Sequence, residues 1–115
     1  MGEDVFCKII KGELPSTKIY EDEKVIVIKD ANPIAKIHWL AIPKKHILDI
    51  MEADDETISY IFDVIRKVAK ENGLAEDGFR VTTNIGENGG QAVKHLHFHI
   101  LGGEKLPTRS KKEKK

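Results

Sequence analysis

Cysteine is almost absent from this sequence, since Cys7 is the only one among 115 residues. A single cysteine cannot form an intramolecular disulfide, which excludes the disulfide framework of small secreted domains. Long apolar runs are absent as well, and none approaches the ~20 residues that a membrane-spanning helix needs. The first residues do not have the pattern of a secretory signal. We therefore expect a cytoplasmic protein with no membrane partner.

The sequence also lacks a net charge, because 19 Lys and Arg balance 19 Asp and Glu. The balance is uneven, since residues 104–115 contain six basic and two acidic side chains. Such a stretch is typical of a solvated, disordered tail, and nucleic acid is not an expected partner. Residues 1–103 are left for a single domain. A chain of this length buries about 65% of its surface on folding, which is enough for one modest core.

Three histidines stand at every second position near the end of the chain. His95, His97 and His99 alternate with apolar residues over the segment 95–101. This two-residue period is typical of a half-buried β-strand, which places the imidazoles on one face and the apolar side chains on the other. A purely structural strand would avoid stacking three groups that carry the same charge when protonated. The run therefore predicts a chemical site on a strand.

Two kinds of chemistry fit this histidine run about equally. A His-x-His pair with a third imidazole suits a catalytic zinc ion with an open coordination position. An imidazole with a free nitrogen lone pair can instead attack phosphorus or a carbonyl carbon. From the run alone, metal ligation and nucleophilic catalysis both remain open.

The preceding segment, residues 84–94, favours phosphate chemistry. It has three glycines, at positions 86, 89 and 90, and glycine lets backbone amides approach a ligand closely. An ordinary hairpin loop would also explain these glycines. Gln91 adds an amide beside the imidazoles, and donors beside a nucleophile stabilise a developing oxyanion or phosphoryl group. A zinc site would instead favour carboxylate or carbonyl partners that orient its histidines.

Hydrophobic periodicity predicts an α+β fold. Strands are expected at 18–21, 25–28, 37–42 and 79–83, followed by the histidine strand. A short helix is expected over residues 6–10, and it ends before Gly12. Residues 58–69 place apolar side chains at three- and four-residue spacing, which indicates a long amphipathic helix, opened by acidic residues and capped by Gly73. The apolar side of the histidine strand is then expected to face this helix, with the imidazoles in an open cleft.

The glycine loop, Gln91 and the segment 95–103 resemble the signature of the histidine-triad superfamily, and in particular its Hint-type nucleoside phosphoramidases. The resemblance extends to residues 4–15, 28–33 and 38–46, so it covers residues 4–103. It implies a HIT-like domain over 1–103 with a five-stranded antiparallel sheet, one long helix and one short helix. It also implies a homodimer in which the two sheets join into one of ten strands.

The resemblance further implies covalent catalysis that requires no cofactor. His97 matches the nucleophile that forms a nucleotidyl-imidazole intermediate, and its neighbouring imidazoles favour a neutral ring near pH 7. His99 matches the position that contacts the phosphate and the leaving group, and it is the candidate acid. His38 matches a further histidine on the phosphate side. Gln91 and the loop amides would stabilise the phosphoryl oxygens.

A purine nucleotide is the ligand that the resemblance implies. Asp30 matches the carboxylate that binds the ribose hydroxyls, although its surroundings would also suit a turn. Asn84 matches a phosphate-side contact. The walls of the base site match Val5, Phe6, Ile9 and Ile28. The other nucleotide-binding candidates are Lys29, Ala31, Gly90, Gln91, Ala92, Val93, His97 and His99.

The sequence departs from this branch at three points. Ala92 stands where many Hint-type proteins have a hydroxyl residue that assists the leaving group, which weakens the expectation of efficient turnover. Some relatives hold structural zinc with a Cys-x-x-Cys pair and two histidines. Here the corresponding ligands are Asp4, Cys7, His46 and His95, which could bind zinc tetrahedrally, or Asp4 could act only as a helix cap. The lysine-rich tail replaces a C-terminus that reaches the partner's active site.

We therefore expect a hydrolase that cleaves the phosphorus–nitrogen or phosphoanhydride bond of purine nucleoside monophosphate adducts and releases AMP or GMP. A diadenosine-polyphosphate hydrolase of the same superfamily is an alternative with the same chemistry, although Gly102 and Gly103 argue mildly against that branch. A purine-nucleotide-binding scaffold with weak activity and a zinc-dependent hydrolase are alternatives from other classes.

Overall fold

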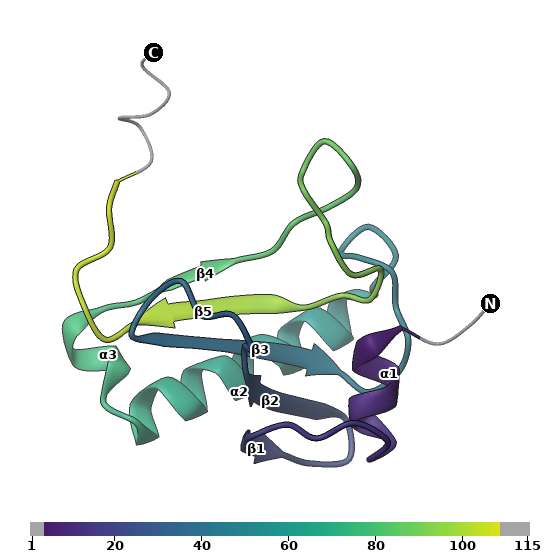
Figure 1. Ribbon diagram of the computed structural model, residues 1–115, viewed down its shortest axis with the longest axis horizontal. Helices are drawn as coiled ribbons and strands as arrows, with labels where there is room; N and C mark the ends of the chain where they lie inside the picture. Colours follow the sequence, from purple (N-terminus) through teal and green to yellow (C-terminus); the bar gives the residue numbers. More distant parts are fainter. Residues whose placement is uncertain (1–3, 109–115) are drawn as a thin grey trace.

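Five strands form one antiparallel sheet in the computed structural model, which describes residues 4–108 (Figure 1). Their order across the sheet is β1–β2–β3–β5–β4, and every neighbouring pair is antiparallel. The predicted sheet of an α+β fold is thus confirmed. The strands are β1 (Lys18–Glu21), β2 (Val25–Lys29), β3 (Ile37–Pro43), β4 (Arg80–Thr82) and β5 (Phe98–Gly102).

The helices within residues 4–108 are α1 (Val5–Ile10), α2 (Asp55–Glu71) and α3 (Leu74–Asp77). The sequence predicted α1 and α2. Helix α2 begins after Asp54, whose side chain accepts a hydrogen bond from the Thr57 amide at 2.8 Å. It ends before Gly73, whose φ of +78° is one that glycine adopts without strain. Helix α3 has only four residues, too few to show a helical period, so hydrophobic patterning did not predict it.

Successive side chains along each strand point to opposite sides, so the sheet has two different faces. One face packs against α2, which lies behind the sheet in Figure 1, and this contact forms the larger core. Ile61 and Ile65 of α2 are almost fully buried there with Phe98 and Ile100 of β5, which confirms the predicted packing of the apolar side of the histidine segment. The opposite face carries a smaller apolar cluster. Its buried members are Phe6, Ile26, Ile28, Leu40 and Ile42.

The register between β3 and β5 brings two histidines together on the face opposite α2. His38 pairs with Leu101, and Leu40 pairs with His99. The two histidines are therefore diagonal neighbours whose side chains point to the same side of the sheet. Two histidines 61 positions apart in sequence thus meet across a strand pair.

The histidine segment is only partly a strand. Strand β5 begins at Phe98, three residues after the predicted start at His95; its last pairs are Thr82 with His99 on the β4 side and Ala41 with Phe98 on the β3 side. The Leu96 amide donates instead to the Ile47 carbonyl oxygen at 2.7 Å. The expectation that all three imidazoles lie in an open cleft is wrong for His95, which is fully buried, and for His97, which is buried with 5% of its surface exposed.

Asp22 ties the hairpin between β1 and β2 to helix α2. Its Oδ2 accepts hydrogen bonds from the hydroxyls of Tyr20 and Tyr60, and its Oδ1 accepts from the amides of Lys24 and Val25 at 2.7 and 2.8 Å. Burial alone would raise the pKa of Asp22, but these donors outweigh it and lower the pKa to about 2. The charged form of Asp22 therefore stabilises the fold.

Replacing Asp22 with alanine is expected to lower the free energy of unfolding at neutral pH by about 2 kcal/mol. A carboxylate whose pKa is depressed on folding contributes stability above its ordinary pKa of 3.8 and loses it as the pH falls towards about 2. The difference between wild type and variant should therefore shrink over that interval. Urea unfolding curves at several pH values measure it, and a difference that stays constant with pH would contradict the assignment.

Two further predictions concern the membrane and the tail. Within residues 4–108, no helix combines the length and the apolar character needed to cross a membrane. The predicted disordered tail falls mostly on residues 109–115, which lie outside the described part of the chain.

Candidate active site

His97 is buried just ahead of β5, with 5% of its surface exposed. Its Nδ1–H donates a hydrogen bond to the carbonyl oxygen of His95 at 2.7 Å. Because a carbonyl oxygen can only accept, Nδ1 holds the proton of the neutral ring and Nε2 keeps its lone pair. Burial lowers the pKa of His97 below 6.5, against the opposing effect of its bond to His95. Near pH 7 the ring is therefore neutral, with a nucleophilic nitrogen at Nε2.

His38 and His99 connect β3 to β5 through a ring-to-ring hydrogen bond. The Ile34 amide donates to His38 Nδ1 at 3.1 Å, so the neutral His38 ring has its proton at Nε2. That Nε2 lies 2.9 Å from His99 Nδ1 and 3.3 Å from Asp30 Oδ2. If His38 Nε2–H donates to His99 Nδ1, that nitrogen is the acceptor, and the neutral His99 ring has its proton at Nε2. His99 thus offers an N–H donor beside His97, whose ring centroid lies 5.0 Å away.

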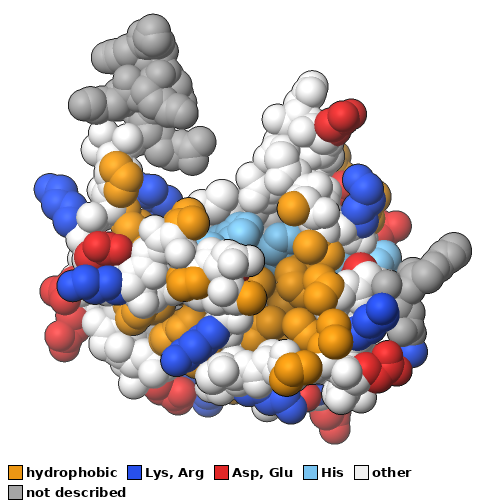
Figure 2. All heavy atoms as spheres, in the orientation of Figure 1, with side chains coloured by type: hydrophobic (Ala, Val, Ile, Leu, Met, Phe, Trp, Pro, Cys, Tyr) orange, Lys and Arg blue, Asp and Glu red, His pale blue; other side chains and the backbone are white. Residues whose placement is uncertain are grey.

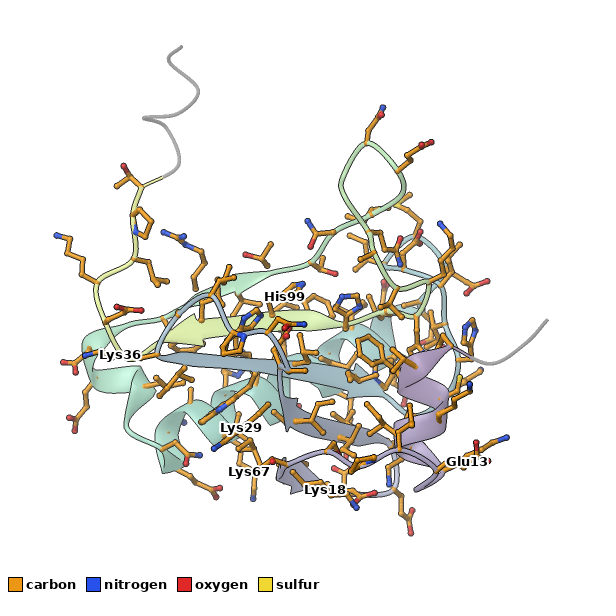
Figure 3. All side chains as sticks on the ribbon, in the orientation of Figure 1. Glu13, Lys18, Lys29, Lys36, Lys67 and His99 are labelled. Carbon is orange, nitrogen blue, oxygen red and sulfur yellow. The ribbon has the colours of Figure 1, made fainter. Side chains whose placement is uncertain are left out.

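His99 is uncharged at neutral pH. Burial lowers its pKa to about 4, with a further contribution from charge on His97 and His38. Figure 3 shows His99 on β5, on the face of the sheet turned away from α2. In Figure 2 histidine atoms reach the surface in the middle of this face, beside a patch of hydrophobic side chains. The candidate acid is therefore a neutral hydrogen-bond donor near pH 7.

Asp30, His38 and His99 also place potential metal ligands within 4.8 Å of one another. A histidine that binds a metal through Nε2 has its proton on Nδ1. His38 Nδ1 accepts a hydrogen bond from the Ile34 amide. If His38 bound a metal through Nε2, its proton would move to Nδ1 and point at the hydrogen of the Ile34 amide. The group is better suited to a hydrogen-bond relay than to an ion. His97 belongs to no ligand group within residues 4–108, so the three motif histidines do not form one metal site.

Another group of potential ligands surrounds the start of α1, and it fits zinc. Asp4 Oδ1 caps the helix by accepting from the Cys7 amide at 2.7 Å, while Oδ2 lies 3.1 Å from His46 Nε2 and 3.2 Å from His95 Nδ1. His95 Nε2 donates to the Pro43 carbonyl oxygen at 2.9 Å, so the neutral ring turns an unprotonated Nδ1 towards the Asp4 carboxylate. One thiolate, one carboxylate and two imidazoles are a suitable tetrahedral donor set.

Gln91 braces two loops against each other. Its Nε2 donates to the carbonyl oxygens of Leu48 at 2.7 Å and Val93 at 3.2 Å, and its Oε1 accepts from the Gly86 amide at 2.9 Å. The sequence placed this amide beside the phosphoryl oxygens. In the structure its hydrogens are given to carbonyl groups, so a phosphate contact would require one of these bonds to open. The contact stays a prediction.

The glycine loop is shaped by internal contacts. Asn84 Nδ2 donates to the Gly89 carbonyl oxygen at 2.8 Å. A Cβ at Gly89 would lie 2.4 Å from the Ile85 carbonyl oxygen, so only glycine fits there. Gly90 has a φ of +76°, which also favours glycine. The loop thus needs these glycines for its own conformation, whatever it binds.

Phe6 connects the predicted base site to the histidines. Its ring centroid lies 5.0 Å from that of His97 in an edge-to-face arrangement. Phe6 belongs to the same buried cluster as Ile28, and Ile9 and Val93 pack against that cluster. The structure therefore brings these predicted nucleotide-binding residues together. The exposed candidates are Val5, Lys29, Ala31, Gly90 and Ala92.

Asp30 has the turn role that the sequence left open, and it also contacts a histidine of the site. Its Oδ1 accepts a hydrogen bond from the Asn32 amide at 2.8 Å, as in a turn. Its Oδ2 faces His38 at 3.3 Å. The carboxylate thus lies at the edge of the histidine cluster, where a ribose contact remains a prediction.

Sequence reasoning missed Thr83, whose hydroxyl donates to the His97 carbonyl oxygen at 2.8 Å. It also missed Pro43 and Leu48, which act through backbone carbonyls. A backbone acceptor has no signal in the residue type. The position of Thr83, near the end of the strand that pairs with the histidine segment, was the one available hint.

A family model described as the HIT domain matches residues 11–106. The chain belongs to the HIT family. A HIT family hydrolase from Clostridium thermocellum is 48% identical, with a TM-score of 0.89, and the match covers 95% of this chain and 97% of that structure. A histidine triad protein from Clostridium difficile is 49% identical, with a TM-score of 0.88 and coverage of 95% and 99%.

A curated relative of this HIT chain has a name that describes zinc binding. The 14 kDa zinc-binding protein of Zea mays is 46% identical over 107 residues, which cover 89% of this chain and 83% of the relative. The HIT fold, with its five-stranded antiparallel sheet, extends over nearly the whole chain, since the match to the Clostridium difficile structure covers 95% of it.

Proposed function

We propose that this HIT protein is a purine nucleoside phosphoramidase that cleaves the phosphorus–nitrogen bond of nucleoside monophosphate adducts and releases AMP or GMP. The observation that carries the proposal is the hydrogen bond from His97 Nδ1 to the His95 carbonyl oxygen, which leaves Nε2 free to attack. The hydrolase with 48% identity supports hydrolytic chemistry. The resemblance to Hint-type phosphoramidases is the reason for proposing a purine nucleotide as the substrate.

In the first step, His97 Nε2 attacks phosphorus, the new N–P bond forms, and the bond to the leaving amine breaks. His99 Nε2–H donates a hydrogen bond to the departing nitrogen or to a phosphoryl oxygen, and the amine takes its proton from water. In the second step, water attacks phosphorus and passes a proton to bulk water, the bond between phosphorus and His97 Nε2 breaks, and the nucleoside monophosphate is released. His97 then regains its lone pair. In this scheme His97 and His99 come from the chain, and water supplies the second nucleophile.

Comparing substrates tests this proposal against the alternatives. An adenosine phosphoramidate and a diadenosine polyphosphate are offered separately to the purified protein, and AMP release is measured. The proposal predicts faster release from the phosphoramidate. Faster release from the polyphosphate would favour the other hydrolase branch, and AMP binding without turnover would favour a scaffold. Loss of activity with a chelator in protein that remains folded and still binds AMP, and recovery with zinc, would favour a zinc hydrolase.

The edge of the sheet supports a homodimer with a ten-stranded sheet. Strand β4 lies at one end of the strand order, so one of its sides has no strand partner within residues 4–108. An open groove of about 510 Å³ lies beside it, with an almost entirely apolar lining of Ile50, Ile58, Phe62, Val81, Thr83 and Phe98. A second copy of this chain would cover both the unpaired edge and the groove.

Replacing Ile58 with lysine is therefore expected to convert a dimer into a monomer, because it places a charge in the covered groove. Light scattering during size-exclusion chromatography measures the mass. Lysine at the neighbouring exposed Ser59, which lines a different pocket, should leave the dimer intact. A monomeric wild type, or a dimer with Ile58→Lys, would contradict the proposed interface.

We also propose that the group formed by Asp4, Cys7, His46 and His95 binds a structural zinc ion. The convergence of four potential ligand atoms within 4.8 Å of one another supports it, as does the 46% identity to a zinc-binding protein. The ion would lie beside the peptide that holds His97 and would take no part in the reaction steps. No cofactor is proposed for catalysis.

A further inference from the structure

The main chain at His97 lies outside the strand ladder. Strand β4 ends at Thr82 and β5 begins at Phe98, and the last residue pair between them is Thr82 with His99. The peptide that carries the proposed nucleophile therefore lacks the ladder bonds that hold His99. A nucleophile acts efficiently only when its nitrogen stays in line with the bond that it breaks. Some other contact must therefore limit the movement of this peptide.

Thr83 supplies such a contact from the residue that follows β4. Its Oγ1–H donates to the His97 carbonyl oxygen at 2.8 Å. The imidazole of His97 is held separately, by the bond from Nδ1 to the His95 carbonyl oxygen at 2.7 Å. One bond fixes the backbone of the residue and the other fixes its ring. Together they determine where Nε2 points.

A competing role for Thr83 is apolar packing. The side chain also lines the groove beside β4, together with Val81 and Phe98. Threonine combines a hydroxyl and a methyl group on one Cβ, so either group could be the reason for its presence. Valine keeps the shape and loses the hydroxyl, whereas serine keeps the hydroxyl and loses the methyl group. The two substitutions therefore separate the two roles.

We propose that Thr83 is a positioning residue that holds the backbone of His97 through its hydroxyl and so keeps Nε2 aligned for attack. The inference rests on the proposed function for its kinetic consequence. The hydrogen bond itself is independent of the substrate. The hydrogen bond from Thr83 reaches the backbone carbonyl oxygen of His97, not a ring nitrogen.

Steady-state kinetics with an adenosine phosphoramidate test the consequence. Thr83→Val is expected to lower kcat about 10-fold while leaving KM and the Kd for AMP nearly unchanged, because alignment is lost and binding is kept. Thr83→Ser is expected to retain most of the wild-type kcat. Thr17→Val, at an exposed threonine before β1, should behave as wild type. Thermal unfolding and molecular mass are measured for each variant, so that kcat refers to folded protein in the same oligomeric state.

Nuclear magnetic resonance of the imidazole N–H groups supplies a second readout that needs no substrate. The Nδ1 proton of His97 should exchange with water faster in Thr83→Val than in wild type or Thr83→Ser, because a looser peptide weakens the bond to His95. Wild-type kinetics and exchange in Thr83→Val, or equal losses in the serine and valine variants, would overturn the proposal. If wild type hydrolyses no phosphoramidate, the proposed function fails, and the exchange rates still decide the role of Thr83.

Discussion

Replacing His97 with alanine is expected to lower the turnover of an adenosine phosphoramidate by about 10⁴-fold or more, because the substitution removes the nitrogen that attacks phosphorus. The Kd for AMP is expected to change only a few-fold. Asp30, Phe6 and Ile28 remain in place in this variant, and they are the candidates for ribose and base contacts. Stopped assays of AMP release measure the first effect, and equilibrium dialysis with AMP measures the second.

His97→Gln controls for the buried volume that alanine leaves empty. The glutamine amide can still donate to the His95 carbonyl oxygen, but it has no nucleophilic nitrogen. The two variants should therefore be equally inactive while differing in thermal stability. Turnover near the wild-type rate in either folded variant would remove His97 from the mechanism.

Metal binding at the start of α1 is expected to depend on the Asp4 carboxylate. Asparagine caps a helix about as well as aspartate, so Asp4→Asn should keep the cap on α1 and lose one ligand. The affinity for Zn²⁺ or Co²⁺ is then expected to fall about 100-fold, while the stability of the metal-free protein changes little. Titration calorimetry measures the affinity, and the Co²⁺ absorption band of a thiolate ligand reports the contact with Cys7 directly.

Asp30→Asn is the matched variant for the other ligand group. Because His38 accepts the Ile34 amide proton, the Asp30 group should not bind the ion, and its asparagine variant should keep the wild-type affinity. Loss of affinity in Asp30→Asn with no change in Asp4→Asn would reverse the assignment of the two groups. Equal affinity in all three proteins would place the ion outside both.

Local patterns in the sequence were sufficient to predict the strands, the long helix and the face that carries the imidazoles. The three- and four-residue spacing of apolar residues in 58–69 fits a helix and does not fit a strand, and α2 covers this segment. The histidine run also has a clear period, but the period could not show where pairing stops. That boundary depends on both neighbouring strands, whose last pairs with β5 are Thr82 with His99 and Ala41 with Phe98, and it leaves His95 and His97 outside the ladder.

The contacts that determine the chemistry of the site depend on tertiary structure. The His97 tautomer follows from the carbonyl oxygen of His95, and the orientation of His95 follows from the carbonyl oxygen of Pro43. Every residue has a carbonyl group, so residue type holds no information about these acceptors. Gln91 shows the opposite case, because its residue type indicated a donor near phosphate while the fold directs its amide to Leu48 and Val93.

Rapid quenching of the wild-type protein with an adenosine phosphoramidate, followed by mass spectrometry of its peptides, tests whether residue 97 forms a bond to phosphorus. We predict that one AMP group is attached to the peptide containing His97, through an acid-labile N–P bond that appears and decays at rates compatible with turnover. Steady hydrolysis with no attached nucleotide at any time, or attachment to another residue, would contradict nucleophilic catalysis by His97.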